Sequence, residues 1–217
     1  MCKCLKFTVL FSLLFFYACQ PEKKEKKQVL TQSKKEVNDT AIVDCNYTFE
    51  EAVLGTKAPD TVIKELQLID VLYYSTDGKL HKGQIVTNKV LASELSEIFA
   101  FILKTKFAVA HVIPVVKYNW DDNLSMLDNN SYSFCYRNVS FSKHASGMAI
   151  DINPYFNPVR WKAGYEDRLD KPVGAKRDTT INGTFYSTHP VVQEFVRLGF
   201  RWGHNFKAKY DDHHFEK

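Results

Sequence analysis

The stretch that decides the fold class is Leu66-Gln-Leu-Ile-Asp-Val-Leu-Tyr-Tyr-Ser-Thr76, then Asp77-Gly78, then Lys79-Leu-His-Lys-Gly-Gln-Ile-Val-Thr87. Two runs rich in β-branched and aromatic residues flank an Asp-Gly pair, and such a pair tolerates the positive φ angles of a tight turn. The pattern predicts a β-hairpin with Asp77-Gly78 at its tip.

A helical pattern follows the hairpin. Apolar residues recur at i, i+4, i+7, i+8, i+11 and i+12, which is the spacing of one helix face that packs on a sheet. Asn88 stands just before this pattern and is expected to cap the helix. The apolar residues are Leu91, Leu95, Ile98, Phe99, Ile102 and Leu103.

The rest of the chain mixes short strands and helices. Thr48 to Glu51 has the spacing of a capping box, and a helix is predicted from Pro190 to Leu198 with Gly199 ending it. Residues 153–186 show little periodicity, so we expect a long surface excursion whose Arg160, Arg168 and Arg177 face water. Short strands are predicted at Ala108–Val116, Phe134–Arg137 and Met148–Ile152. The prediction is an α+β fold, a small mainly antiparallel sheet with flanking helices.

Length, composition and charge limit the number of domains and the classes of function that the chain can have. The chain has 217 residues, of which 45% are hydrophobic, enough for one well-buried core. Its net charge of +4 is located in the first 38 residues, which carry +5 and leave −1 for the remainder. The folded part therefore has no electrostatic basis for binding nucleic acid.

The N-terminus has the pattern of an export signal. Lys3 and Lys6 precede an apolar run over residues 7–18, and Ala18-Cys19 resembles a bacterial lipoprotein processing site at which Cys19 would be acylated. An ordinary secretory signal or an uncleaved anchor is the alternative. We therefore expect a signal over 1–19, a polar tether over 20–40 and one domain over 41–217, lipid-anchored at a bacterial membrane in the cell envelope or periplasm.

The two cysteines of the folded part, Cys45 and Cys135, could pair in an oxidising envelope or remain free thiols. No C-x-x-C pair occurs in the sequence, which excludes a thiolate zinc site of that type.

The first group of residues that could bind a metal lies in Ser142-Lys-His-Ala-Ser-Gly-Met-Ala-Ile-Asp151. Strand alternation sends Asp151 to the face opposite the apolar Ile150 and Ile152, and Gly147 lets the chain bend so that His144 approaches Asp151. An imidazole and a carboxylate are both zinc ligands, and two of them leave room for a third ligand and a water.

A second group lies in Lys209-Tyr-Asp-Asp-His-His-Phe-Glu216. Its adjacent histidines offer a third nitrogen ligand, and its adjacent aspartates offer a base to take a proton from a water. Each motif alone is weak, because such spacings arise by chance, but together they point to one metal site.

These motifs resemble the D-alanyl-D-alanine carboxypeptidase-type metallopeptidases, the VanY-like enzymes of the hedgehog/DD-peptidase fold. The resemblance runs from about residue 60 to 217, and the chain departs from it at His204 and Phe206, where members often carry Gly and Trp. The motifs that carry it are Asn130–Arg137, Ser142–His144, Gly147–Pro154, Asn157-Pro158, Gly199–Gly203 and Asp211–Glu216.

The resemblance implies one Zn²⁺ held by His144, Asp151 and His214. It also implies that Asp211 is the general base, that Arg137 is a cation for catalysis and substrate binding, and that Ser142 is a polar neighbour of the substrate.

The implied reaction is hydrolysis of a peptide bond in peptidoglycan stem peptides by a monomeric enzyme. The bond that is cut stays open between a terminal D-alanine, an L,D bond and a cross-link. The alternative is a lipoprotein module that binds zinc or peptidoglycan without cleaving it, since the fold alone does not establish catalysis.

Strand geometry and the resemblance disagree about the base. In a regular strand over Asp211–Glu216, Asp212 would share a face with His214, whereas Asp211 would point away. The resemblance assigns Asp211, which requires that the chain is not regularly extended there. We follow the resemblance and expect a break where a loop enters the strand at Tyr210-Asp211.

Overall fold

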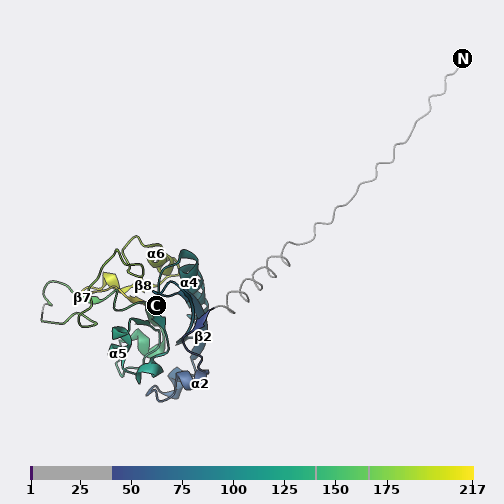
Figure 1. Cartoon of the computed structure of the whole chain (residues 1–217). Coiled ribbons are helices and arrows are strands. Elements are labelled where there is room, and N and C mark those ends of the chain that lie inside the picture. Colours follow the sequence, from purple (N-terminus) through teal and green to yellow (C-terminus); the bar gives the residue numbers. More distant parts are fainter. Residues whose placement is uncertain (2–40, 140, 166) are drawn as a thin grey trace. The chain divides into compact units, whose positions relative to one another are not determined.

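The computed structural model describes Met1 and residues 41–139, 141–165 and 167–217 (Figure 1). The predicted export signal with Cys19 and the predicted tether lie, apart from Met1, outside the described residues. From residue 41 onward the described chain contains five α-helices and four small sheets, which confirms the α+β class. Two of the strand pairs are parallel and the others are antiparallel. Within this part of the chain, no helix combines the length and apolar character needed to cross a membrane.

The predicted hairpin is confirmed. Strand β2 (Leu66–Tyr74) pairs antiparallel with β3 (Leu80–Asn88), and Gly78 at the tip has a φ of +77°. A two-residue strand, β1 (Ile42–Val43), adds to β3 in parallel and completes a three-stranded sheet. The hairpin forms where the sequence places its turn because Gly reaches this conformation without steric cost.

Helix α4 (Ala92–Thr105) packs on β2 with the predicted stripe facing the core, although Leu103 is only half-buried. The prediction that Asn88 caps the helix is wrong. Asn88 ends β3, its side chain accepts a hydrogen bond from the backbone of Val90, and the helix begins after Leu91 without a side-chain cap.

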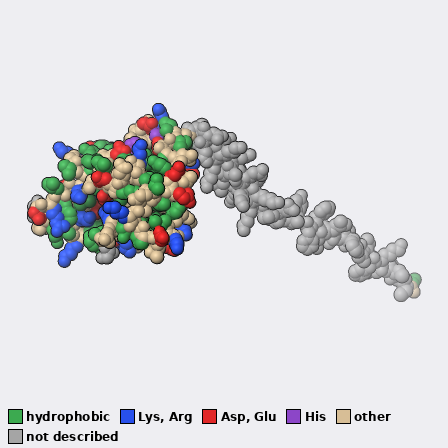
Figure 2. Space-filling model, turned by 90° about the horizontal axis from the view of Figure 1, so that it is seen from below, with side chains coloured by type: hydrophobic (Ala, Val, Ile, Leu, Met, Phe, Trp, Pro, Cys, Tyr) green, Lys and Arg blue, Asp and Glu red, His purple; other side chains and the backbone are tan. Residues whose placement is uncertain are grey.

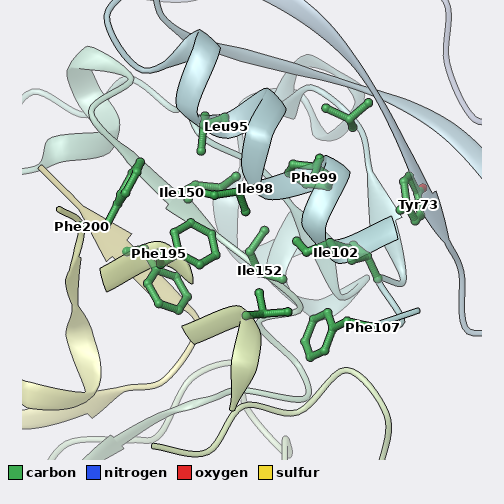
Figure 3. Close-up of a cluster of buried hydrophobic side chains, with 14 of the residues drawn as sticks. Tyr73, Leu95, Ile98, Phe99, Ile102, Phe107, Ile150, Ile152, Phe195 and Phe200 are labelled. Atoms are coloured by element: carbon green, nitrogen blue, oxygen red, sulfur yellow. The ribbon is translucent and has the colours of Figure 1, made fainter. Parts of the chain in front are cut away.

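The main core lies between α4, β6 (Ala149–Asp151) and α6 (Pro190–Arg197). Figure 3 shows Ile98 of α4, Ile150 of β6 and Phe195 of α6 in this cluster. Phe195 also stacks on Phe215 of β10 (His214–Glu216), with ring centroids 3.8 Å apart. Each fully buried side chain of this size contributes about 1.5–3 kcal/mol, so the core fixes β6 and β10 against each other.

Strand β10 lies between β6 and β8 (Arg201–Trp202) in an antiparallel sheet. Since Phe215 points into the core, alternation turns His214 and Glu216 to the other face. The register places His214 opposite Asp151, which brings the two predicted motifs together. Strands β7 (Val159–Trp161) and β9 (Lys209–Asp211) form a separate antiparallel pair, and a two-residue turn connects β9 to β10.

The remaining elements are short. The capping box at Thr48 is confirmed, because the Glu51 amide donates to Thr48 Oγ1 (3.2 Å) and the Thr48 amide donates to Glu51 Oε2 (2.7 Å). Cys45 and Cys135 are both free thiols. The other elements are α2 (Phe49–Ala52), α3 (Asp60–Ile63), β4 (His111–Val112), η1 (Val115–Tyr118), α5 (Asp122–Leu127), β5 (Asn130–Ser131), η2 (Lys143–Ser146) and η3 (Gly203–Asn205).

The predicted strand at Phe134–Arg137 is wrong. This segment has no partner strand; instead, the Phe134 amide donates to Val86 O (3.0 Å) and the Cys135 amide to His144 O (3.2 Å). The strand of this region lies earlier, at β5, which pairs in parallel with β4. Phe134 and Cys135 are buried although they pair with no strand, so burial in the core explains the apolar composition that resembles a strand.

Both signs of charge are present on the face of the domain shown in Figure 2. The mixture agrees with the net charge of −1 that the sequence leaves for the residues after 38.

Candidate metal centre

Three side chains from three elements meet at one point. His144 lies on η2, Asp151 ends β6 and His214 begins β10. His144 Nε2 is 3.1 Å from Asp151 Oδ1 and 3.0 Å from His214 Nδ1, while His214 Nδ1 is 2.9 Å from the same carboxylate oxygen. All three residues are buried, so this is a closed cluster rather than a surface grouping.

The outer nitrogens of the two imidazoles fix which nitrogen carries the proton. His144 Nδ1 lies 2.7 Å from the carbonyl oxygen of Ser133, so it must donate. His214 Nε2 lies 2.8 Å from a carboxylate oxygen of Glu216 and donates in the same way. The inner nitrogen of each histidine is therefore the one that can give up its proton to a metal, as in metal-ligating histidines whose other ring nitrogen donates to an oxygen.

The electrostatics of the cluster favour a cation. Burial lowers the pKa of His214, but hydrogen bonds to Asp151 and Glu216 outweigh it and raise that pKa to about 10. Burial raises the pKa of Asp151, yet its interactions with His144 and His213 hold it well below the usual range. A site that stabilises a proton between these atoms also stabilises a divalent metal that takes the proton's place.

The donor set fits Zn²⁺. Two imidazole nitrogens and one carboxylate oxygen are zinc ligands, and a tetrahedral ion with such bonds spaces its ligand atoms about 3.3 Å apart, close to the separations found here. Three protein ligands leave a fourth position open, which is the arrangement of catalytic rather than structural zinc sites.

Asp211 lies beside this cluster at the end of β9. Its Oδ2 is 2.7 Å from Lys209 Nζ, and its buried Oδ1 has no hydrogen-bond partner among the described residues. Burial raises the pKa of Asp211, but interactions with His213, His214 and Lys209 hold it below its ordinary value. The carboxylate is therefore ionised at neutral pH, and its Oδ1 accepts no hydrogen bond from the described residues, so it can take up a proton as a general base does.

The chain is not regularly extended between Asp211 and His214. β9 ends at Asp211, a turn occupies residues 212–213, and β10 begins at His214, so the break lies one to two residues later than expected. The turn places Asp211 and His214 in the same cavity. Period-2 alternation from Asp212 to His214 therefore does not apply.

Asp212 is fully buried and has structural partners instead. Arg160 donates to its Oδ2 from Nε (3.1 Å) and Nη2 (2.8 Å), Arg177 Nε lies 3.2 Å from the same oxygen, and His204 Nδ1 lies 2.5 Å from Oδ1. The expectation that Arg160 and Arg177 face water is wrong. Both bind a carboxylate distant in the sequence, and so tie the excursion to the turn that follows Asp211.

His213 is also buried. Its Nδ1 lies 2.7 Å from the carbonyl oxygen of Asn157, and its Nε2 lies 3.0 Å from Asp211 Oδ1 without the alignment of a hydrogen bond. The excursion thus holds His213 next to Asp211, and His213 is not one of the three residues whose ligand atoms converge.

One cavity of about 630 Å³ contains the cluster, Asp211, and the predicted substrate-binding residues Arg137 and Ser142. Arg137 Nη2 pairs with Asp122 (2.6 Å) and donates to Tyr132 Oη (3.1 Å), whereas its buried Nε has no hydrogen-bond partner in the described chain. Since both contacts use Nη2, Arg137 keeps its other N–H donors for a bound molecule.

Residues 137–217 match a family model described as D-alanyl-D-alanine carboxypeptidase. The predicted resemblance is confirmed for this part of the chain. The matching segment includes Arg137, all three cluster residues and Asp211. Searches of curated proteins and of solved structures give no match.

Sequence reasoning missed three contributors to this carboxypeptidase-like site. Lys209 and Glu216 were each two positions from a candidate residue in a strand, and that spacing could have identified them as neighbours on one face. Gly203 carries no such signal. A Cβ atom at Gly203 would lie 2.7 Å from Asp211 O, 2.8 Å from Asp211 Cβ and 3.1 Å from His214 Cβ.

We expect Gly203→Ala to weaken zinc binding and turnover by about 10–100-fold, the range for disturbed support of a metal ligand. The added methyl group must push Asp211 and His214 out of place. Metal content and kcat/KM measure the effect, and Gly164→Ala, where a Cβ meets no atom within 4 Å, is the control. Since Gly164 has a φ of +89°, that control tests backbone strain without crowding. Unchanged zinc affinity in Gly203→Ala would contradict the packing argument.

Proposed function

We propose that this protein is a zinc-dependent peptidase that hydrolyses peptidoglycan stem peptides. The observation that carries the proposal is a buried His-Asp-His cluster that lines one cavity together with the ionised carboxylate of Asp211. The carboxypeptidase-like family match over residues 137–217 supports the substrate class.

Zn²⁺ bound by His144, Asp151 and His214 would lower the pKa of a water molecule and polarise the substrate carbonyl. Asp211 would accept a proton at Oδ1 from the attacking water, because its Oδ2 is already bound by Lys209. As the peptide bond breaks, the same carboxyl group would return that proton to the leaving amine.

Arg137 and Ser142 would bind the substrate. The guanidinium of Arg137 is fixed by Asp122 and Tyr132 through Nη2, so its remaining donors can stabilise negative charge that develops on a substrate oxygen. The Ser142 hydroxyl lines the same cavity and has no partner among the described side chains. Ser142 directly precedes η2, and Arg137 lies five residues before Ser142.

We expect Lys209→Met to lower kcat about tenfold, since it removes a charge-assisted hydrogen bond from the base and leaves Asp211 Oδ2 free. Lys209→Arg should restore part of the loss because it keeps the charge. Steady-state kinetics of both variants measure the effect. Lys171→Met, which removes another cation of the cavity, is the control. A rise in KM with unchanged kcat would assign Lys209 to substrate binding instead.

We further propose that the enzyme acts in the bacterial cell envelope as a monomer, anchored by a lipid on Cys19 and not bound to nucleic acid. Cys19→Ser is the variant that tests the anchor, by loss of lipid labelling and of the membrane fraction. A polar tether would let an anchored domain reach peptidoglycan close to the membrane.

The function is tested by incubating the purified protein with muropeptides, with and without a chelator, and identifying the products by mass spectrometry. Cleavage that the chelator abolishes and added Zn²⁺ restores supports the proposal, and the products show which bond is cut. Zinc binding without any cleavage would instead favour a module that binds zinc or peptidoglycan.

A further inference from the structure

A second cavity, of about 510 Å³, lies on the other side of the segment that carries Arg137. Side chains alternate along this segment: Arg137 lines the cavity of the metal centre, whereas Tyr136 and Asn138 line the second cavity. One strip of chain therefore separates the two cavities. We propose that the second cavity binds a sugar ring of the glycan to which the stem peptide is attached.

Two consecutive residues that line the cavity have a backbone conformation that is rare for side-chain-bearing residues. Asn119 and Trp120, both of which line it, have consecutive positive φ angles of 54° and 64°. Asn adopts this conformation readily, but a bulky aromatic residue seldom does, and such positions persist only where the surroundings enforce them. Trp120 is held by a hydrogen bond from Nε1 to Leu54 O (2.9 Å) and by edge contact with Phe134.

Polar groups converge on the cavity without protein partners. The amides of Asn119 and Asn138, the hydroxyl of Tyr136 and the ammonium of Lys57 all line it, and none makes a side-chain hydrogen bond or ion pair within the described chain. The cavity thus combines two amphipathic aromatic residues with two amides, one hydroxyl and one cation.

This combination selects among ligand classes. A sugar presents an apolar C–H face suited to aromatic rings and a rim of hydroxyl groups suited to amides. A phosphate ligand would call for several cations, and Lys57 is the single one among the described residues that line the cavity. Asn side chains both donate and accept, which matches an acetamido group.

The choice of an N-acetylated amino sugar rests on the proposed function, because such sugars carry the stem peptides of peptidoglycan. The fit of the cavity to a sugar ring is independent of the proposed function. An occupied second cavity would hold the glycan end of the substrate while the peptide passes Arg137 toward the metal centre.

The test is a titration of the purified protein, kept in chelator, with the trimer of N-acetylglucosamine, followed by NMR of the tryptophan indole N–H groups. The chain has three tryptophans, and each indole donates to a different carbonyl: Trp120 to Leu54, Trp161 to Leu169 and Trp202 to Asp212. We expect only the Trp120 signal to shift, with an affinity in the millimolar range.

Asn138→Ala should weaken this binding about tenfold, the effect of one lost hydrogen bond in a cavity. Gln67→Ala removes an amide from a different cavity and should leave binding unchanged. No Trp120 shift, a shift of Trp161 instead, equal binding of cellotriose, or full affinity in Asn138→Ala would each overturn the proposal. Because the protein is metal-free here, a failure of the proposed peptidase activity cannot affect the result.

Discussion

Replacing Asp211 by Asn is expected to lower kcat by about 10²–10⁴-fold while the protein keeps its zinc and its fold. An amide cannot accept a proton from water, yet it has the same shape and can still bind Lys209 through its oxygen. Kinetics on the cleaved muropeptide, metal analysis and thermal unfolding measure the three properties separately.

Asp212→Asn should have the opposite profile. Its carboxylate is fully buried among Arg160, Arg177 and His204, and removing one partner of a buried charge cluster costs about 3–5 kcal/mol. We expect a large loss of stability, with kcat of the folded fraction much less affected than in Asp211→Asn. Loss of turnover in a stable Asp212→Asn protein, with Asp211→Asn active, would show that Asp212 is the base.

The second large effect is expected from removing metal ligands. His144→Ala with His214→Ala removes both imidazole nitrogens and leaves only Asp151, so zinc content should fall from about one ion per chain to none, with complete loss of hydrolysis. Elemental analysis after dialysis measures the metal. His111→Ala, which changes a half-buried histidine outside the cluster, should retain zinc and activity. Stoichiometric zinc in the double variant would rule out this ligand set.

Local chemistry explains how much of the fold could be predicted. The hairpin, the stripe of α4 and the capping box each depend on neighbours within about one turn or one strand, and all three are present. The segment Phe134–Arg137 could not be predicted, because whether apolar residues form a strand depends on a partner elsewhere. Its amides reach Val86 and His144, which lie in other elements.

The same reasoning applies to the site. His144, Asp151 and His214 belong to short motifs, and strand alternation predicts the orientation of Asp151. The partners of Asp212 could not be predicted, since Arg160 lies 52 positions away and nothing in its own neighbourhood marks it as the partner of a buried carboxylate. The choice between Asp211 and Asp212 depended on a turn of two residues that periodicity cannot detect.

The arginine cluster around Asp212 has a consequence for the dynamics of the domain. Since Arg160 and Arg177 join the irregular segment 153–186 to the turn between β9 and β10, neither can open without breaking these ion pairs. Amide hydrogens in that segment should therefore exchange with solvent in one cooperative event with those of residues 211–214, not as a fraying loop. A protease cut within the segment would then also disturb the surroundings of Asp211.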